Sequence, residues 1–111
     1  MKGHQWVKEF PGAIFVCDKD GILLEMNDLA KAQENDQDLV GTNILDCHPE
    51  PARRKFEQML KSGQANIYTI EKRGKKKLIY QVPWTIDGSY VGFVELELEL
   101  PEVMPHFIRE G

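Results

Sequence analysis

The alternation of leucine and glutamate near the end of the chain is the feature that most constrains its fold. Apolar residues occupy every second position and acidic residues fill the positions between them: Val94, Leu96, Leu98 and Leu100 against Glu95, Glu97 and Glu99. Side chains of a β-strand alternate between the two faces of its sheet, so this pattern predicts a strand with one apolar and one acidic face. We expect the apolar face to pack and the acidic face to meet water or a polar partner.

Turn residues divide the rest of the chain into further strands. The strand-like runs are 13–18, 22–26, 66–72, 77–84 and 90–100. The pairs Asp20-Gly21, Arg73-Gly74 and Asp87-Gly88 separate neighbouring runs, and glycine accepts the positive φ that tight hairpin turns require. Pro83 cannot donate to a ladder, which predicts a bulge or a frayed strand end at that position.

Short helices are predicted between the second and third strands. Asn27 is a suitable N-cap for a helix over 28–34, and one helical turn is expected to end at Gly41. Residues 42–47 form another short turn. The best helix spans 51–62, where Phe56, Met59 and Leu60 recur at helical spacing. This order of elements predicts an α+β domain, with helices on one face of an antiparallel sheet.

Length and charge narrow the class of protein. A chain of 111 residues suits one domain. Fourteen Lys and Arg against eighteen Asp and Glu give a net charge of −4, which argues against a general nucleic-acid binder. No apolar run is long enough for a membrane helix, and the first ten residues do not resemble a signal peptide. We therefore expect a cytoplasmic protein with neither nucleic acid nor membrane as a partner.

The ordered set of segments resembles the PAS sensor domain over residues 9–100. The segments that carry the resemblance are FPGAIFVCDKDGILLEMN at 10–27, LVGTNILDCHPEPARRKFEQML at 39–60, KKLIYQVPW at 76–84 and the Gly88-Ser89-Tyr90-Val91-Gly92 turn. Residues 1–8 then form an N-terminal segment, for which a helix is one option, and residues 101–111 form a C-terminal tail. The resemblance implies a five-stranded antiparallel sheet of order 2-1-5-4-3 cupped by helices. It also implies a sensor in two-component or similar signal transduction, acting as a homodimer and through a signalling partner protein.

A small-molecule ligand is expected between the sheet and the long helix if that space is open. The apolar and aromatic residues predicted to line it are Met26, Phe56, Met59, Leu60, Tyr80, Val82, Trp84, Val94 and Leu96. Tyr80 or Trp84 would offer a donor to orient the ligand. A filled core produces the same sequence pattern, so a pocket and a filled core stand as equal alternatives.

Cys47 and His48 are candidates for chemistry at the start of the long helix. Some PAS domains hold haem iron with a histidine of this helix, so His48 is a candidate haem ligand. A structural role is the favoured interpretation, because Pro49 and Pro51 place His48 before the helix. The Asn-Cys-Arg-Phe-Leu-like string of flavin-binding light sensors is absent, which disfavours flavin. Cys17 and Cys47 do not make a disulfide framework, and the three histidines have no zinc-site spacing.

Three functions compete at this point. The favoured one is a sensor that binds a small molecule or cofactor and relays the signal through dimer or partner contacts. The alternative is a protein-interaction module with a filled core, whose dimer interface would use the glutamate face of the last strand together with Trp6, Val7 and Phe10. An enzyme ranks last, because no carboxylate lies on the predicted apolar faces. The five positive charges at 72–77 are expected to be a solvated turn, with docking of an acidic partner as the alternative.

Overall fold

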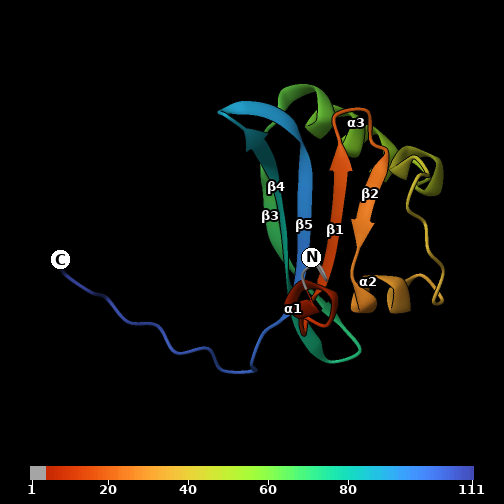
Figure 1. The fold of residues 1–111 in the computed structure, drawn as a ribbon. Coiled ribbons are helices and arrows are strands. Elements are labelled where there is room, and N and C mark those ends of the chain that lie inside the picture. The colour runs from red at the N-terminus through yellow and green to blue at the C-terminus, as the bar shows by residue number, and fades with distance from the viewer. Residues whose placement is uncertain (1–4) are drawn as a thin grey trace.

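The computed structural model describes residues 5–111 and shows a five-stranded antiparallel sheet of order β2-β1-β5-β4-β3. The strands are β1 (Ala13–Asp18), β2 (Leu23–Met26), β3 (Asn66–Lys72), β4 (Lys75–Ile86) and β5 (Ser89–Glu99). The helices are α1 (Gln5–Lys8), α2 (Asp28–Gln33), the 3-10 helix η1 (Ile44–Cys47) and α3 (Ala52–Ser62). Figure 1 shows β5 between β1 and β4, with α2 and α3 beside the sheet. The predicted α+β class and strand order are confirmed.

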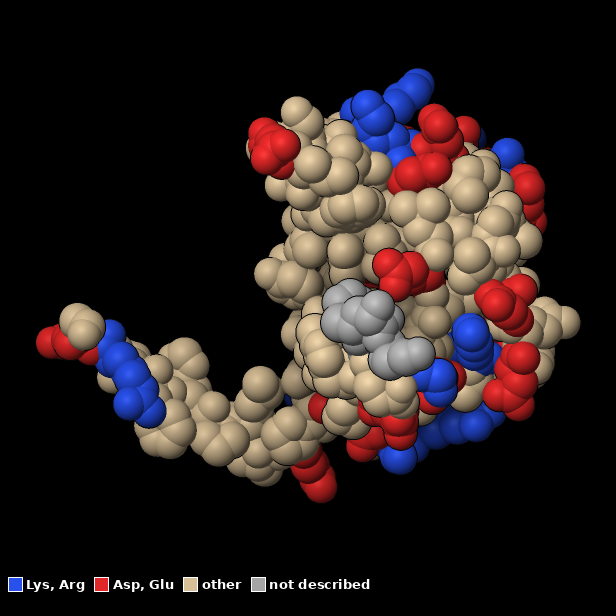
Figure 2. Space-filling view, viewed as in Figure 1, with Lys and Arg blue, Asp and Glu red and all other residues tan. Residues whose placement is uncertain are grey.

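The tail after β5 runs away from the sheet. Residues 101–111 contain no helix or strand and are exposed throughout. Figures 1 and 2 show them as an extended arm leaving the body of the domain. Residues 1–4 of the N-terminal segment lie outside the described residues, and α1 occupies its second half. None of the helices within residues 5–111 is long and apolar enough to cross a membrane.

Pro83 lies inside β4 rather than at its end. The strand continues to Ile86, with a register shift between Trp84 and Thr85 that supplies the expected irregularity one residue later. β3 reaches β4 only as far as the pair Asn66–Gln81. At Pro83 β4 therefore has a single neighbouring strand, which is the position where a sheet tolerates proline.

The ladder register assigns the alternating residues of β5 to the two faces of the sheet. Glu95 pairs with Phe15 and Gln81, and Glu97 pairs with Ala13 and Ile79, all on the face that the helices cover. We call this the inner face. The intervening residues Val94, Leu96 and Leu98 lie on the opposite, outer face. The expectation that the leucines pack and the glutamates meet solvent is therefore wrong. The two-residue alternation places the glutamates and the apolar residues on opposite faces of the sheet, but it does not determine which face the helices cover.

The small buried core lies between the inner face and α3. Cys17, Met59 and Phe93 form its centre, and Phe56, Leu60 and Tyr90 pack around it. The hydroxyl of Tyr90 donates to the carbonyl oxygen of Leu60 at 2.9 Å, which ties the end of α3 to β5. α3 ends at Gly63, whose φ of 68° is the left-handed conformation that favours glycine at this position.

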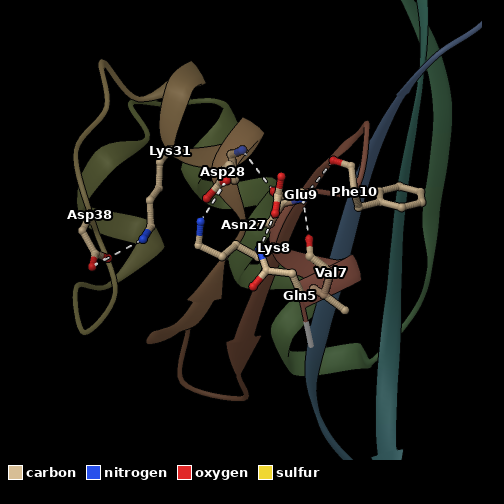
Figure 3. Close-up of polar contacts among 10 residues, drawn as sticks. Gln5, Val7, Lys8, Glu9, Phe10, Asn27, Asp28, Lys31 and Asp38 are labelled. Atoms are coloured by element: carbon tan, nitrogen blue, oxygen red, sulfur yellow. Dashed lines mark hydrogen bonds and ion pairs between the residues drawn. The ribbon is translucent and has the colours of Figure 1, made fainter. Parts of the chain in front are cut away.

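Asn27 joins three parts of the chain. Its side-chain oxygen accepts from the backbone N–H of Ala30 at 3.1 Å, as the predicted N-cap of α2, and from the N–H of Ile14 at 2.9 Å. Its amide nitrogen donates to the carbonyl oxygen of Gly12 at 2.8 Å and to that of Val7 at 3.2 Å. Figure 3 shows this buried side chain between α1 and α2, beside the exposed ion pair of Lys8 and Asp28. One carboxamide thus fixes α1, β1 and α2 relative to one another.

Candidate functional site

A cavity of about 160 Å³ lies between the inner face of the sheet and the helices η1 and α3. Aromatic rings form one part of its wall: Phe15 from β1, Phe56 from α3 and Phe93 from β5. Polar groups form another part: Glu34 after α2, Gln81 from β4, and Glu95 and Glu97 from β5. The cavity therefore has an apolar region and an acidic one.

Three of the residues predicted to line a pocket do so. Phe56, Met59 and Leu60 face the cavity from α3, as their helical spacing predicts. Met26 pairs with Phe15, and its sulfur accepts from the N–H of Leu39 at 3.4 Å. It borders a second hollow beside α1 and does not line the main cavity.

The remaining predicted lining residues lie on the wrong face. They are Tyr80, Val82, Trp84, Val94 and Leu96, which the β4–β5 register places on the outer face. Their apolar character predicts that they line the pocket, whereas the residues that alternate with them on β4 and β5 are the ones that face α3. The indole N–H of Trp84 donates to the carbonyl oxygen of Cys17 at 3.1 Å, so this donor serves the sheet and not a ligand.

A chain of side-chain hydrogen bonds runs across three strands to the acidic region. The amide nitrogen of Asn66 on β3 lies 2.9 Å from the side-chain oxygen of Gln81. The amide nitrogen of Gln81 in turn donates to Oε1 of Glu95 at 2.6 Å. Gln81 is buried and its carboxamide is oriented by these two contacts. The relay fixes the position of the Glu95 carboxyl group.

The electrostatic environment keeps a proton on Glu95. Desolvation and the neighbouring carboxyl of Glu97 raise the pKa of Glu95 to about 8, and the hydrogen bond from Gln81 opposes this only in part. Tyr68 of β3 belongs to the same environment, since burial and the charges of Glu95 and Glu97 raise its pKa. The sequence pattern did not predict that this acidic group lies in the cavity. The available clue was Gln81, a polar residue inside the otherwise apolar run at 78–84.

His48 lines the cavity but has a structural contact of its own. Its Nδ1–H donates to the carbonyl oxygen of Ile44 at 2.6 Å, and its ring packs on Phe56 with 4.5 Å between centroids. A cavity of about 160 Å³ is smaller than the pockets that hold drug-sized ligands, and haem is larger than those ligands. The residues around His48 therefore do not fit a haem group in this arrangement.

The two cysteines have different environments. Cys17 is buried in the core beside Phe93 and Met59, whereas Cys47 is exposed at the end of η1. Both thiols are free in the part of the chain that the structure describes. Over the same residues, no group of three or more His, Cys, Asp and Glu side chains is arranged to hold a metal ion.

The fold has well-matched solved counterparts, although no protein-family model and no curated protein matches the chain. A C-terminal domain from Streptococcus mutans superposes with a TM-score of 0.70 at 22% identity, over 86% of this chain and 80% of that one. The PAS domain of BvgS from Bordetella pertussis gives 0.64 at 18% identity, over 88% and 83% of the two chains. A sensory box sensor histidine kinase from Vibrio cholerae gives 0.60 at 12% identity, over 86% of each chain. With its 2-1-5-4-3 sheet and these structural counterparts, the chain has the PAS fold.

Proposed function

We propose that this domain senses a small molecule in the cavity beneath α3 and relays its presence to a partner protein. The cavity is the observation that carries the proposal. Its volume of about 160 Å³ is close to that of an engineered apolar cavity that binds benzene. Well-filled cores contain few voids larger than a water molecule, so this space argues against a purely structural core. The sensor histidine kinase that shares the fold supports a sensory role.

The contacts around α3 suggest how occupancy is relayed. Met59 and Leu60 line the cavity, and the carbonyl of Leu60 accepts the hydrogen bond from Tyr90 of β5. A ligand that shifts α3 therefore changes its contact with the central region of the sheet. In thermodynamic terms, the ligand favours the arrangement of α3 that binds it more tightly.

The test compares two variants that introduce the same side chain at different places. Ile44→Phe fills the cavity from η1, and Leu29→Phe places the ring on the exposed side of α2. The purified chain and both variants are screened against a metabolite library by thermal shift and native mass spectrometry. We expect a ligand that stabilises the parent and Leu29→Phe but not Ile44→Phe. If no compound binds the parent, or if Ile44→Phe binds equally well, the sensing proposal is wrong.

We also propose that the outer face of the sheet mediates homodimerisation. Ile67 and Tyr80 are neighbours on this face and remain 50% and 38% exposed. The glutamate face, which the alternative of an interaction module assigned to a dimer interface, lies beneath the helices instead. Sedimentation velocity tests the proposal: Ile67→Lys is expected to dissociate the dimer, and Ala32→Lys on α2 is expected to leave it intact. A monomeric parent chain would contradict it.

We also propose that the domain has no enzymatic activity, although the expected absence of carboxylates from the pocket does not support this. Glu95 and Glu97 do line the cavity, so the expected lack of carboxylates there is wrong. The hydrogen bonds of the polar groups join Glu95 to Gln81 and to Glu97, and His48 to a backbone carbonyl. Such contacts orient a bound molecule, whereas a nucleophilic enzyme requires a base held against its nucleophile. Turnover of a bound compound that Glu95→Gln abolishes would contradict the proposal.

A further inference from the structure

The cavity carries carboxyl groups without an accompanying basic side chain of Lys or Arg. Glu95 and Glu97 project from β5, and Glu34 approaches from the end of α2. Within residues 5–111, His48 is the only basic side chain that lines the cavity. A desolvated carboxylate is costly unless a positive charge accompanies it. Desolvation and the neighbouring Glu97 raise the pKa of Glu95 to about 8, so this carboxyl group is mostly protonated at neutral pH.

The opposite wall suits the body of a small organic molecule. Phe15, Phe56 and Phe93 line it, and aromatic faces attract cations as well as apolar groups. The cavity volume of about 160 Å³ matches a molecule of about six heavy atoms, by analogy with the cavity that binds benzene. The relay from Asn66 through Gln81 holds the Glu95 carboxyl in one orientation before any ligand arrives. The site therefore combines an apolar, aromatic wall with a carboxyl group whose orientation is already fixed.

We infer that the cavity binds a small organic monocation, an amine with an apolar body, whose charged end contacts Glu95 and Glu97. This inference rests on the proposed sensing function and names the chemical class of its ligand. The bound ammonium group replaces the proton of Glu95, which passes to solvent, so the charge inside the cavity is conserved. The other titratable side chains that line the cavity are Glu34, Glu97, His48, Cys17 and Cys47, and Tyr68 of β3 interacts with the same carboxyl groups. His48 is the only side chain among them that can add a positive charge.

Three probes with one carbon skeleton separate charge from shape. They are isopentylammonium, isopentanol and isopentanoate, which are cationic, neutral and anionic at neutral pH. Isothermal titration calorimetry on the whole chain is expected to give the ammonium at least about tenfold higher affinity than the alcohol, with the carboxylate weakest. Repeating the titration in buffers of different ionisation enthalpy is expected to show release of about one proton per ammonium bound.

Two matched variants test whether Glu95 is the group that recognises the charge of the ammonium probe. Glu95→Gln is expected to weaken ammonium binding at least about tenfold, to remove most of the preference for the ammonium over the alcohol and to abolish proton release. Glu99→Gln changes a more exposed carboxylate of the same strand, which faces Lys75 at 3.6 Å, and is expected to bind all probes as the parent does. Circular dichroism shows whether each variant is folded.

The outcomes distinguish this inference from the sensing proposal. If the alcohol or the carboxylate binds as tightly as the ammonium, the cavity binds ligands but the inference of a cation is wrong. If none of the probes binds, the inference is also wrong, and the sensing proposal is decided by the library screen with Ile44→Phe. If Glu95→Gln retains ammonium binding and proton release, the charge is recognised elsewhere and the inference fails.

Discussion

The amide nitrogen of Gln81 lies 2.6 Å from a carboxyl oxygen of Glu95, across the ladder between the two longest strands of the sheet. This contact holds an acidic group against the helices, where an apolar residue would ordinarily pack. The same amide is oriented from its other side by Asn66. The acidic end of the cavity is therefore built into the sheet itself, and its protonation is expected to influence the stability of the domain.

Stability is expected to fall as the pH rises from about 4.5 to about 8. Burial and Glu97 raise the pKa of Glu95 from its ordinary 4.5 to about 8, so across this window the unfolded chain loses a proton that the folded chain keeps. The stabilisation present below the lower value is thus lost as the pH passes the higher one. Glu95→Gln removes this titration. Relative to the parent, its free energy of unfolding is expected to increase by roughly 2–4 kcal/mol between these limits.

Urea denaturation of the parent and Glu95→Gln at both pH limits measures this change. Glu99→Gln serves as the control, because its carboxyl is exposed beside Lys75. A difference between Glu95→Gln and the parent that stays constant with pH would show that Glu95 titrates normally.

Asn27→Ala is expected to destabilise the domain by about 2–4 kcal/mol, because it removes a helix cap and leaves buried backbone groups unpaired. The side chain contacts the backbone at Gly12, Ile14 and Ala30, and it is only 4% exposed. Thermal and urea unfolding measure the loss. Gln33→Ala removes an exposed carboxamide from α2 and is expected to change stability by less than about 0.5 kcal/mol. Equal effects of the two substitutions would contradict the assignment of Asn27 as a structural centre.

The order of the strands and helices could be predicted because their boundaries are set by local chemistry. Asn27 caps α2 as the sequence indicates, and α3 ends at Ser62, the last residue of the predicted helix. The hairpin turns also lie where their glycines predict: Arg73, Gly74, Asp87 and Gly88 all have positive φ. Such signals depend on a few neighbouring residues, and they need no knowledge of the tertiary contacts.

The composition of the cavity could not be predicted in the same way. The alternation at 94–100 is compatible with either face of β5 packing against α3, and hydrophobicity favoured the leucine face. The structure instead places Glu95 inward, where the carboxamide of Gln81 and the carboxyl of Glu97 satisfy it. That pairing joins two strands and arises only from the register. Apolar patterning alone therefore cannot identify the lining residues of a pocket that is built on polar contacts between strands.

Gly92→Ala is expected to destabilise the domain by at least about 2 kcal/mol through overpacking. A Cβ atom at this position would overlap the carbonyl oxygen of Cys17 and lie 2.8 Å from the indole nitrogen of Trp84. These are the two atoms of the 3.1 Å hydrogen bond that crosses the sheet at this point. The methyl group must therefore displace the bond or the strand. Tryptophan fluorescence during urea unfolding reports both stability and the surroundings of Trp84, and Ser89→Ala on the same strand is the control. Unchanged stability and fluorescence in Gly92→Ala would contradict the observed packing.

The two cysteines are expected to differ in reactivity by at least about 100-fold in the folded domain, because Cys17 can react only after local or global opening. Cys17 is 5% exposed, and burial raises the pKa of its thiol, so little reactive thiolate is present. Cys47 is exposed at the end of η1. A chromogenic disulfide reagent is expected to modify one thiol rapidly in native buffer and the second only in denaturant. Cys47→Ser should remove the rapid phase, and Cys17→Ala should preserve it. Two rapid phases in the folded parent would show that the core around Cys17 opens far more readily than its packing against Met59 and Phe93 implies.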